Sequence, residues 1–187
     1  YLSPILHKYN FIHGFFTKKS SEIGLSSLSK FFNKNNKNYF LNQIHSNAIV
    51  FGSKINLEEK YDADGIICDG LNQNLWIYTA DCMPILFADK KLRIVAALHC
   101  GRAGLEKNII KNLIELFDDF GTPRKNLLVA IGPSISKKNY LFDKDSIYKF
   151  YKRLKLEGAL PLKNEKFLYK FSDLKKFSEK DLYSLDI

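Results

Sequence analysis

Four short apolar segments follow one another closely between residues 63 and 99, and this arrangement limits the fold more than any other feature of the sequence. Each segment is rich in β-branched, aromatic and aliphatic residues, which favour β-strands. The segments are ADGIIC (63–68), LWIYTAD (75–81), PILFAD (84–89) and LRIVAALH (92–99). Asp89-Lys90-Lys91 separates the last two, which predicts a tight hairpin. Because hydrophobicity is nearly continuous within each segment, we expect strands that are buried on both faces.

A helical pattern follows these strands. Apolar residues recur at three- and four-residue steps from Leu105 to Phe117, and Gly121 marks the end of the pattern. LLVAIG (127–132) predicts another buried strand, and residues 145–154 predict a second helix. Together the elements predict a mixed α/β (α+β) fold, in which helices pack outside a mixed β-sheet core or sandwich.

Length and composition agree with one globular domain over residues 1–187. Hydrophobic residues make up 45% and charged residues 26% of the chain, as in ordinary soluble proteins. An apolar run such as Ile94–Leu98 is far shorter than the roughly 18 residues of a membrane span, so we expect no membrane partner. Three cysteines are a small and odd number that suits a reducing compartment, which predicts a cytoplasmic protein.

The net charge of +9 does not by itself indicate nucleic-acid binding. Residues 61–136, the most apolar part of the chain, carry eight Lys/Arg against nine Asp/Glu, so the excess lies towards the two ends. The basic residues are nearly all lysines, and the only arginines are Arg93, Arg102, Arg124 and Arg153. Because bidentate recognition of phosphate and guanine favours arginine, we expect no nucleic-acid partner.

Three polar groups stand where apolar segments end, and they supply two histidines and a cysteine. The groups are QIH (43–45), TADC (79–82) and LHCGRAG (98–104). Imidazole nitrogen and thiolate sulfur are ligands that zinc takes in proteins. Three protein ligands at His45, Cys82 and His99 would leave a fourth position open to water or substrate, which is the arrangement of a catalytic metal.

Two other interpretations of these residues stay open. Each residue could be an ordinary buried cysteine or hydrogen-bonded histidine, because the spacings of 37 and 17 residues match no zinc finger or ribbon. Cys82 could instead act as a nucleophile, with His99 or His45 as its base and Asp81 or Asp64 as the carboxylate that orients the base.

In their order along the chain, six motifs resemble the YfiH-type laccase-domain family. Its members were once called polyphenol oxidases and are now understood as purine nucleoside phosphorylases. The motifs are HGFFT (13–17), NQIHSN (42–47), DADGIICD (62–69), TADCMPILFAD (79–89), AALHCGRAGL (96–105) and AIGPSI (130–135). The resemblance implies a mixed α/β sandwich, and it implies that the family's metal ligands fall on His45, Cys82 and His99.

By this resemblance the chain is a zinc-dependent purine nucleoside phosphorylase, with copper as another possible metal. Such an enzyme cleaves adenosine, inosine or methylthioadenosine with phosphate to free base and ribose 1-phosphate, and it deaminates adenosine as a side activity. The catalytic candidates are Cys82, His99 and Asp81, the last because it stands beside Cys82. Arg102 and the backbone around Gly132 are the candidate phosphate contacts.

The sequence departs from the family pattern at several places. Arg102-Ala103 stands where the family has a Trp-Arg pair, Ser134 replaces a cysteine, and residues 18–21 shorten an N-terminal glycine-rich loop. Because the family continues beyond the position of Ile187, we expect its C-terminal segment to be missing here. The alternative functions are a copper-dependent polyphenol oxidase and a non-catalytic, metal-stabilised binding protein. Four histidines in all disfavour the first, because multicopper sites need clustered histidines.

The metal hypothesis makes a geometric prediction. The ligating atoms of His45, Cys82 and His99 should lie within about 3–4 Å of one another, and the cluster should line a cleft. Cys82 should end a strand beside the strand that ends at His99. Cys68 and Cys100 should stay outside the coordination sphere.

Overall fold

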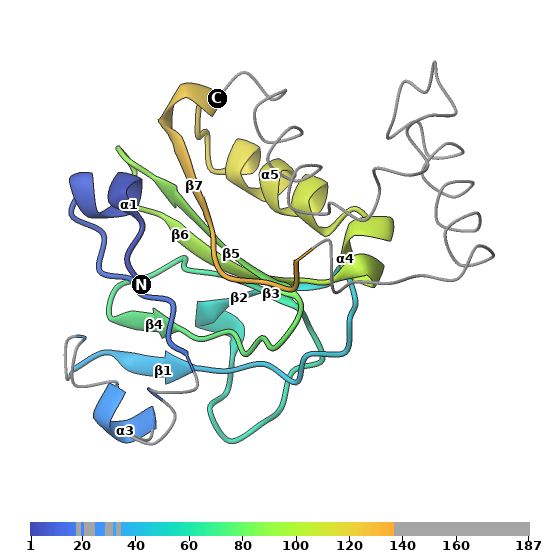
Figure 1. Ribbon diagram of the computed structural model, residues 1–187. Coiled ribbons are helices and arrows are strands. Elements are labelled where there is room, and N and C mark those ends of the chain that lie inside the picture. Colours follow the sequence, from blue (N-terminus) through green and yellow to red (C-terminus); the bar gives the residue numbers. More distant parts are fainter. Residues whose placement is uncertain (18–19, 21–24, 29–31, 33–34, 137–187) are drawn as a thin grey trace, which may run out of the picture. The chain divides into compact units, whose positions relative to one another are not determined.

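The computed structural model describes residues 1–17, 20, 25–28, 32 and 35–136 (Figure 1). Contacts between residues divide the chain into Tyr1–Ser134 and Ile135–Ile187, and the fold below is that of the first unit. The helix expected at residues 145–154 lies outside the described residues, and the single domain over residues 1–187 stays a prediction. None of the described helices combines the length and the apolar character that crossing a bilayer requires.

The core of the first unit is a five-stranded mixed sheet with the order β2-β3-β6-β5-β7. Its strands are β2 (Ile49–Phe51), β3 (Gly65–Ile67), β5 (Met83–Asp89), β6 (Val95–Cys100) and β7 (Leu127–Ile131). Strands β2 and β3 are parallel, whereas β3–β6, β6–β5 and β5–β7 are antiparallel. The predicted mixed α/β fold with a mixed sheet core is therefore confirmed.

The hairpin between β5 and β6 is present, but its turn is longer than expected. Asp89 ends β5, and its side-chain Oδ1 accepts hydrogen bonds from the N–H groups of Lys91 and Leu92, at 2.6 and 2.9 Å. Arg93 then takes a left-handed backbone conformation (φ 64°). Strand β6 consequently begins at Val95 rather than at Leu92, because the chain cannot continue a ladder through a left-handed residue.

The segment expected as a strand at residues 75–81 is mostly irregular, which corrects that prediction. Only Leu75 belongs to a strand, β4 (Gln73–Leu75), which pairs in parallel with β1 (Lys37–Tyr39) as a second small sheet. The apolar character of the segment serves packing instead of pairing. Trp76 donates from Nε1 to Asn38 Oδ1 at 2.9 Å, and its ring stacks on Phe40 with centroids 6.1 Å apart.

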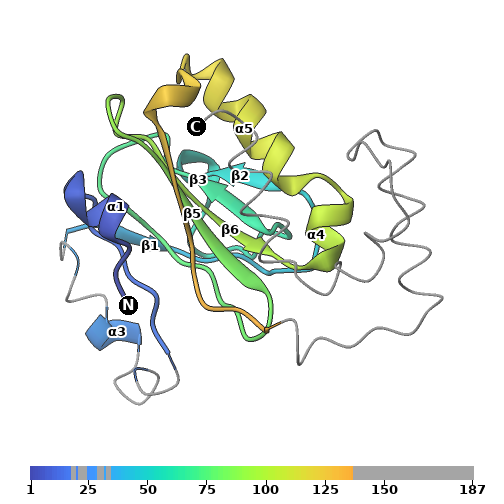
Figure 2. The ribbon, with the colours of Figure 1, turned by 45° about the horizontal axis from the view of Figure 1, so that its top comes forward.

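The expected helix from residue 105 to 117 is divided into two. Helix α4 (Arg102–Glu106) ends before Asn108, which takes a left-handed conformation (φ 62°), and α5 (Ile109–Asp119) begins after it. The buried residues of α5 are Ile109, Leu113, Ile114 and Phe117. Phe117 packs on Phe87 of β5, with ring centroids 6.3 Å apart. Figures 1 and 2 both show α5 on one side of the main sheet.

The opposite face of the main sheet packs against β1, β4 and the N-terminal segment. Ala97 of β6 follows Ala96, the partner of Phe87, so its side chain points away from α5. A buried cluster on this face joins Ala97 and Ile66 to Tyr39 and Leu41. The short helices α1 (Pro4–Lys8) and α3 (Leu25–Leu28) belong to this N-terminal part (Figure 1). The main sheet is thus covered on both faces.

Candidate metal centre

His99 lies on β6, one residue before the strand ends, and is 5% exposed. In the ladder it stands opposite Pro84 of β5. Its Nδ1 lies 2.7 Å from Oδ1 of Asp64, a carboxylate that is completely buried. Because an ionised carboxylate only accepts hydrogen bonds, Nδ1 carries the proton and donates a hydrogen bond to Asp64. The other ring nitrogen, Nε2, is therefore the one with a free lone pair.

Asp64 holds the chain that carries His45 as well as the ring of His99. Its two oxygens accept hydrogen bonds from the backbone N–H groups of Ile44 (3.3 Å), His45 (3.0 Å) and Ser46 (2.6 Å), and from the Ser46 hydroxyl (2.7 Å). Burial alone would raise the pKa of Asp64, but the hydrogen bonds from His99, Ser46 and His45 outweigh it and hold the pKa below its ordinary value. One buried anion thus fixes two of the three candidate ligands.

His45 takes a left-handed backbone conformation (φ 57°), which is uncommon for a residue other than glycine, although histidine is among the enriched types. Its N–H donates to Asp64, and its carbonyl oxygen accepts from Lys107 Nζ at 3.0 Å. The side chain is exposed. These contacts on both sides of the residue hold a conformation that costs on the order of 1–3 kcal/mol elsewhere.

Cys82 does not end a strand, which corrects the prediction. It stands one residue before β5 begins, at the end of the irregular segment, and is half-buried. Its neighbour across the β5–β6 ladder is Gly101, where a Cβ atom would lie 2.6 Å from Cys82 Sγ and 3.4 Å from His45 Cδ2. Any larger residue at position 101 would overlap the Cys82 thiol. The cluster therefore requires glycine at Gly101.

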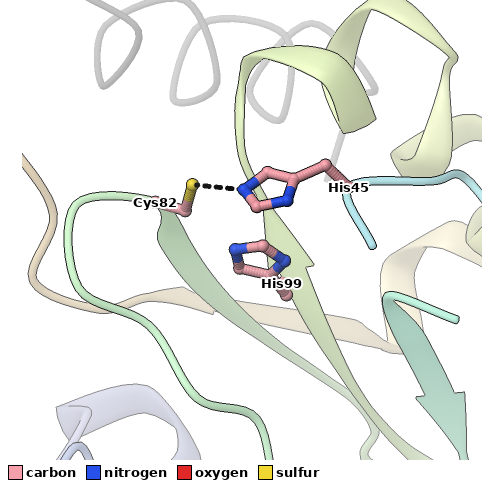
Figure 3. A group of neighbouring side chains, drawn as sticks. All are labelled: His45, Cys82 and His99. Atoms are coloured by element: carbon pink, nitrogen blue, oxygen red, sulfur yellow. Dashed lines mark hydrogen bonds between the residues drawn. The ribbon is translucent and has the colours of Figure 1, made fainter. Parts of the chain in front are cut away.

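The three side chains meet at the end of β6, as Figure 3 shows. Their ligating atoms all lie within 4.8 Å of one another, and Cys82 Sγ is 3.8 Å from His45 Nε2. This upper bound of 4.8 Å on the distances between ligating atoms exceeds the 3–4 Å that we expected. The donor set, two imidazole nitrogens and one thiol, suits zinc or copper. His99 is buried, Cys82 half-buried and His45 exposed, so the cluster opens to solvent on the His45 side.

The environment of Cys82 disfavours an independent nucleophile. Burial raises the pKa of the Cys82 thiol, and the charges of Asp81 and Asp64 raise it further. An active-site thiolate normally has a lowered pKa from a positive neighbour. A metal cation would provide that positive charge directly, and coordination deprotonates a thiol.

The other predicted residues lie at different places. Asp81 is exposed beside Cys82, and Arg102 of α4 donates to Glu106 at 2.5 Å. The N–H of Gly132 donates to the Pro84 carbonyl at 2.8 Å, so this N–H is already used in a hydrogen bond. Cys68 contacts the Gly70 carbonyl oxygen at 2.9 Å.

Cys100 is buried within the sheet, and burial raises the pKa of its thiol strongly. Neither Cys68 nor Cys100 belongs to the cluster, as expected. The sequence suggested Asp64 as an acid/base group or as the partner of a nucleophilic cysteine, not as the support of two histidines, and it suggested no role for Gln43. The position of Gln43 in the NQIH motif, two residues before His45, is the signal that could have identified it.

An apolar cavity of about 780 Å³ lies between the N-terminal segment and strands β5 and β6, and none of His45, Cys82 and His99 lines it, so this cavity is not the cleft expected at the cluster. Its lining includes Pro84, which stands opposite His99, and Ala80, two residues before Cys82. Aromatic side chains form much of its wall, among them Phe15, Phe16, Trp76 and Tyr78. A cavity of this size and character is typical of sites for small organic ligands.

Comparison with known proteins gives a consistent set of relatives. Residues 25–187 match the family model described as "Multi-copper polyphenol oxidoreductase laccase". A purine nucleoside phosphorylase of Synechocystis is 31% identical over 137 residues, which is 70% of this chain and 52% of the relative. One of Rickettsia prowazekii is 37% identical over 111 residues, 59% of this chain and 45% of the relative. The chain therefore spans about half the length of the curated relatives it matches.

Solved structures agree with the fold. A crystal structure of a Neisseria meningitidis protein matches with a TM-score of 0.62 and 25% identity, covering 76% of this chain and 57% of that one. The YfiH protein of Bacillus licheniformis matches with a TM-score of 0.54 and 22% identity, covering 68% of this chain and 49% of that one. The second likeness concerns the fold alone.

Proposed function

Because the chain belongs to the multi-copper polyphenol oxidoreductase laccase family, whose curated relatives are named purine nucleoside phosphorylases, we propose that it acts in zinc-dependent phosphorolysis of purine nucleosides. The observation that carries the proposal is the convergence of His45, Cys82 and His99, with the buried carboxylate of Asp64 bound to the ring of His99 and to the backbone N–H of His45. Histidines that bind a metal almost always donate their other ring N–H to a carboxylate, a carbonyl or a water, as His99 donates to Asp64.

In the proposed reaction, an oxygen of phosphate bonds to the anomeric carbon of adenosine, inosine or methylthioadenosine. The glycosidic C–N bond breaks, its electron pair goes to the purine, and a proton is added to the departing base. His45, Cys82 and His99 would hold the zinc, which would supply positive charge for the phosphate oxygens. Asp81, exposed beside Cys82, is the proposed proton-transfer group, and Arg102 on α4 is the proposed phosphate contact.

The residues around the cluster suit such a substrate. The cluster is open to solvent on the His45 side, which would give phosphate access to a metal bound there. The separate apolar cavity, whose wall includes aromatic side chains, offers flat apolar surface that would suit a purine base. Asp64 keeps His99 in the tautomer that presents Nε2, and it is itself too deeply buried to meet a substrate.

The test is an assay of the purified full chain, loaded with zinc, on adenosine with and without phosphate. We expect adenine and ribose 1-phosphate only when phosphate is present, loss of turnover in Cys82→Ala, and normal turnover in the matched control Cys68→Ala. Full activity in Cys82→Ala would refute the proposal. Release of ammonia would identify the proposed adenosine deaminase side activity, and turnover that stops without oxygen would instead indicate the copper oxidase.

A further inference from the structure

The segment that carries Cys82 has little backbone support. It leaves β4 at Leu75, and Trp76 N–H still donates to the Tyr39 carbonyl at 3.0 Å. The next regular pairing begins at Met83, opposite Cys100. Within the described part of the chain, the backbone between Ile77 and Cys82 is held by hydrogen bonds at one residue only, Tyr78.

Both hydrogen bonds at Tyr78 come from the side chain of Gln43. Gln43 Nε2 donates to the Tyr78 carbonyl at 2.6 Å, and Tyr78 N–H donates to Gln43 Oε1 at 2.8 Å. The carboxamide thus uses one donor and one acceptor, as a neighbouring strand would. Its pairing with Tyr78 joins residue 43, two before His45, to a residue four before Cys82.

The Gln43 side of this connection is firmly anchored. Asn42 N–H donates to the Tyr61 carbonyl at 2.9 Å, and Asn42 forms an isolated parallel bridge with Asp62. After Gln43, the N–H groups of Ile44, His45 and Ser46 all donate to Asp64. Because residues 42–46 are fixed to the sheet in this way, they form a rigid reference from which Gln43 can hold a weakly supported segment.

We propose that Gln43 is a positioning residue of the metal centre, which holds the Cys82 segment so that its thiol faces the two histidines before a metal binds. The inference rests on the metal centre of the proposed function and adds a role for a residue that is not itself a ligand. The hydrogen bonds lie at the surface, and Tyr78 is 58% exposed, so their loss should cost little folding stability. What changes is the conformational freedom of the segment that the metal must order on binding.

The experiment is a cobalt(II) titration of the full chain, in which the thiolate-to-cobalt absorption band reports coordination by Cys82. Gln43→Met keeps the length of the side chain and removes both hydrogen bonds. The matched control is Asn42→Leu, which removes the neighbouring side-chain bond from Asn42 Nδ2 to Asp62 Oδ1 (2.5 Å). We expect Gln43→Met to weaken cobalt binding about tenfold, with a weaker thiolate band, and Asn42→Leu to change affinity less than about twofold.

A double variant separates positioning from general damage. In Cys82→Ala the segment supplies no ligand, so adding Gln43→Met should leave the residual cobalt affinity unchanged. If Gln43→Met does not fold, Gln43→Glu keeps the acceptor for Tyr78 N–H and loses only the donor, and we expect an intermediate affinity.

Equal affinity in Gln43→Met and Asn42→Leu, or the same loss with and without Cys82, overturns the inference. A wild-type protein that binds cobalt without a thiolate band overturns the metal centre itself. The failure of the positioning role and the failure of the proposed function therefore give different results.

Discussion

Replacement of Asp64 by asparagine tests the organisation of the site most directly. The carboxylate accepts five hydrogen bonds, from three backbone N–H groups, the Ser46 hydroxyl and His99 Nδ1. Asparagine has nearly the same shape, but its NH₂ group donates, so it must face at least one of these donors. Its oxygen also lacks the charge that strengthens the remaining bonds.

The magnitude follows from the burial of the residue, which is 0% exposed. A buried donor without an acceptor costs about 1–3 kcal/mol, and hydrogen bonds to charged groups contribute about 1.5–3 kcal/mol each. We expect Asp64→Asn to lower the free energy of unfolding of the metal-free protein by about 2–4 kcal/mol. Loss of the carboxylate that binds the ring of His99 should also weaken zinc binding by about 10–100-fold.

Two measurements check this prediction: urea unfolding of the metal-free protein, and zinc affinity by competition with a chromophoric chelator. Asp62→Asn is the matched control, because Asp62 is exposed and its side chain is bonded to Asn42 at the surface. An unfolding free energy within about 0.5 kcal/mol of wild type, together with unchanged zinc affinity, would refute the reasoning, since both effects come from the same buried bonds.

Three further predictions concern the cluster and the core. Gly101→Ala places a Cβ 2.6 Å from Cys82 Sγ and should weaken cobalt binding about tenfold or more, whereas Gly70→Ala, whose Cβ meets nothing closer than 3.4 Å, should not; equal titration curves contradict this. Cys100, buried and with a raised thiol pKa, should resist iodoacetamide in the native protein and react only after unfolding, while zinc should protect Cys82; mass spectrometry of the modified peptides decides. Phe117→Ala should lower the unfolding free energy by about 3–5 kcal/mol in urea titration, and a loss below about 1 kcal/mol would show that α5 is not packed on Phe87 as described.

The sequence predicted the elements whose signal is local. Hydrophobic runs and turn residues predict the hairpin between residues 84–89 and 92–99 and the buried strand at 127–132. The structure contains all three strands, and their observed ends lie within about three residues of the predicted ends. The strand expected at 75–81 is wrong because its apolar side chains, such as Trp76, pack on other aromatic rings without a partner strand. A hydrophobic pattern indicates that side chains are buried, but buried side chains do not require a hydrogen-bonded neighbouring strand.

The candidate ligands could be named from their chemistry, but their support could not. His45, Cys82 and His99 carry donor atoms that zinc takes, and their places at the ends of apolar segments, together with the family motifs, distinguish them from the other histidines and cysteines. The role of Asp64 toward both histidines depends on the β3–β6 pairing, in which Gly65 stands opposite Leu98 and thereby places Asp64 beside His99. Gln43 acts on Tyr78, 35 residues away, and no local pattern carries that contact.

The register of β3 against β6 also determines when the centre can form. His45 and His99 are 54 residues apart in the chain, and the carboxylate that orients both comes from between them. The β5–β6 hairpin closes over a short loop and can pair early, whereas contact of His99 with Asp64 requires a long-range closure. During synthesis, a nascent chain that has not yet released β6 contains His45 and Cys82 but no place for the second imidazole. In the proposed metal centre, all three ligands would therefore be available to an ion only after β6 has paired with β3.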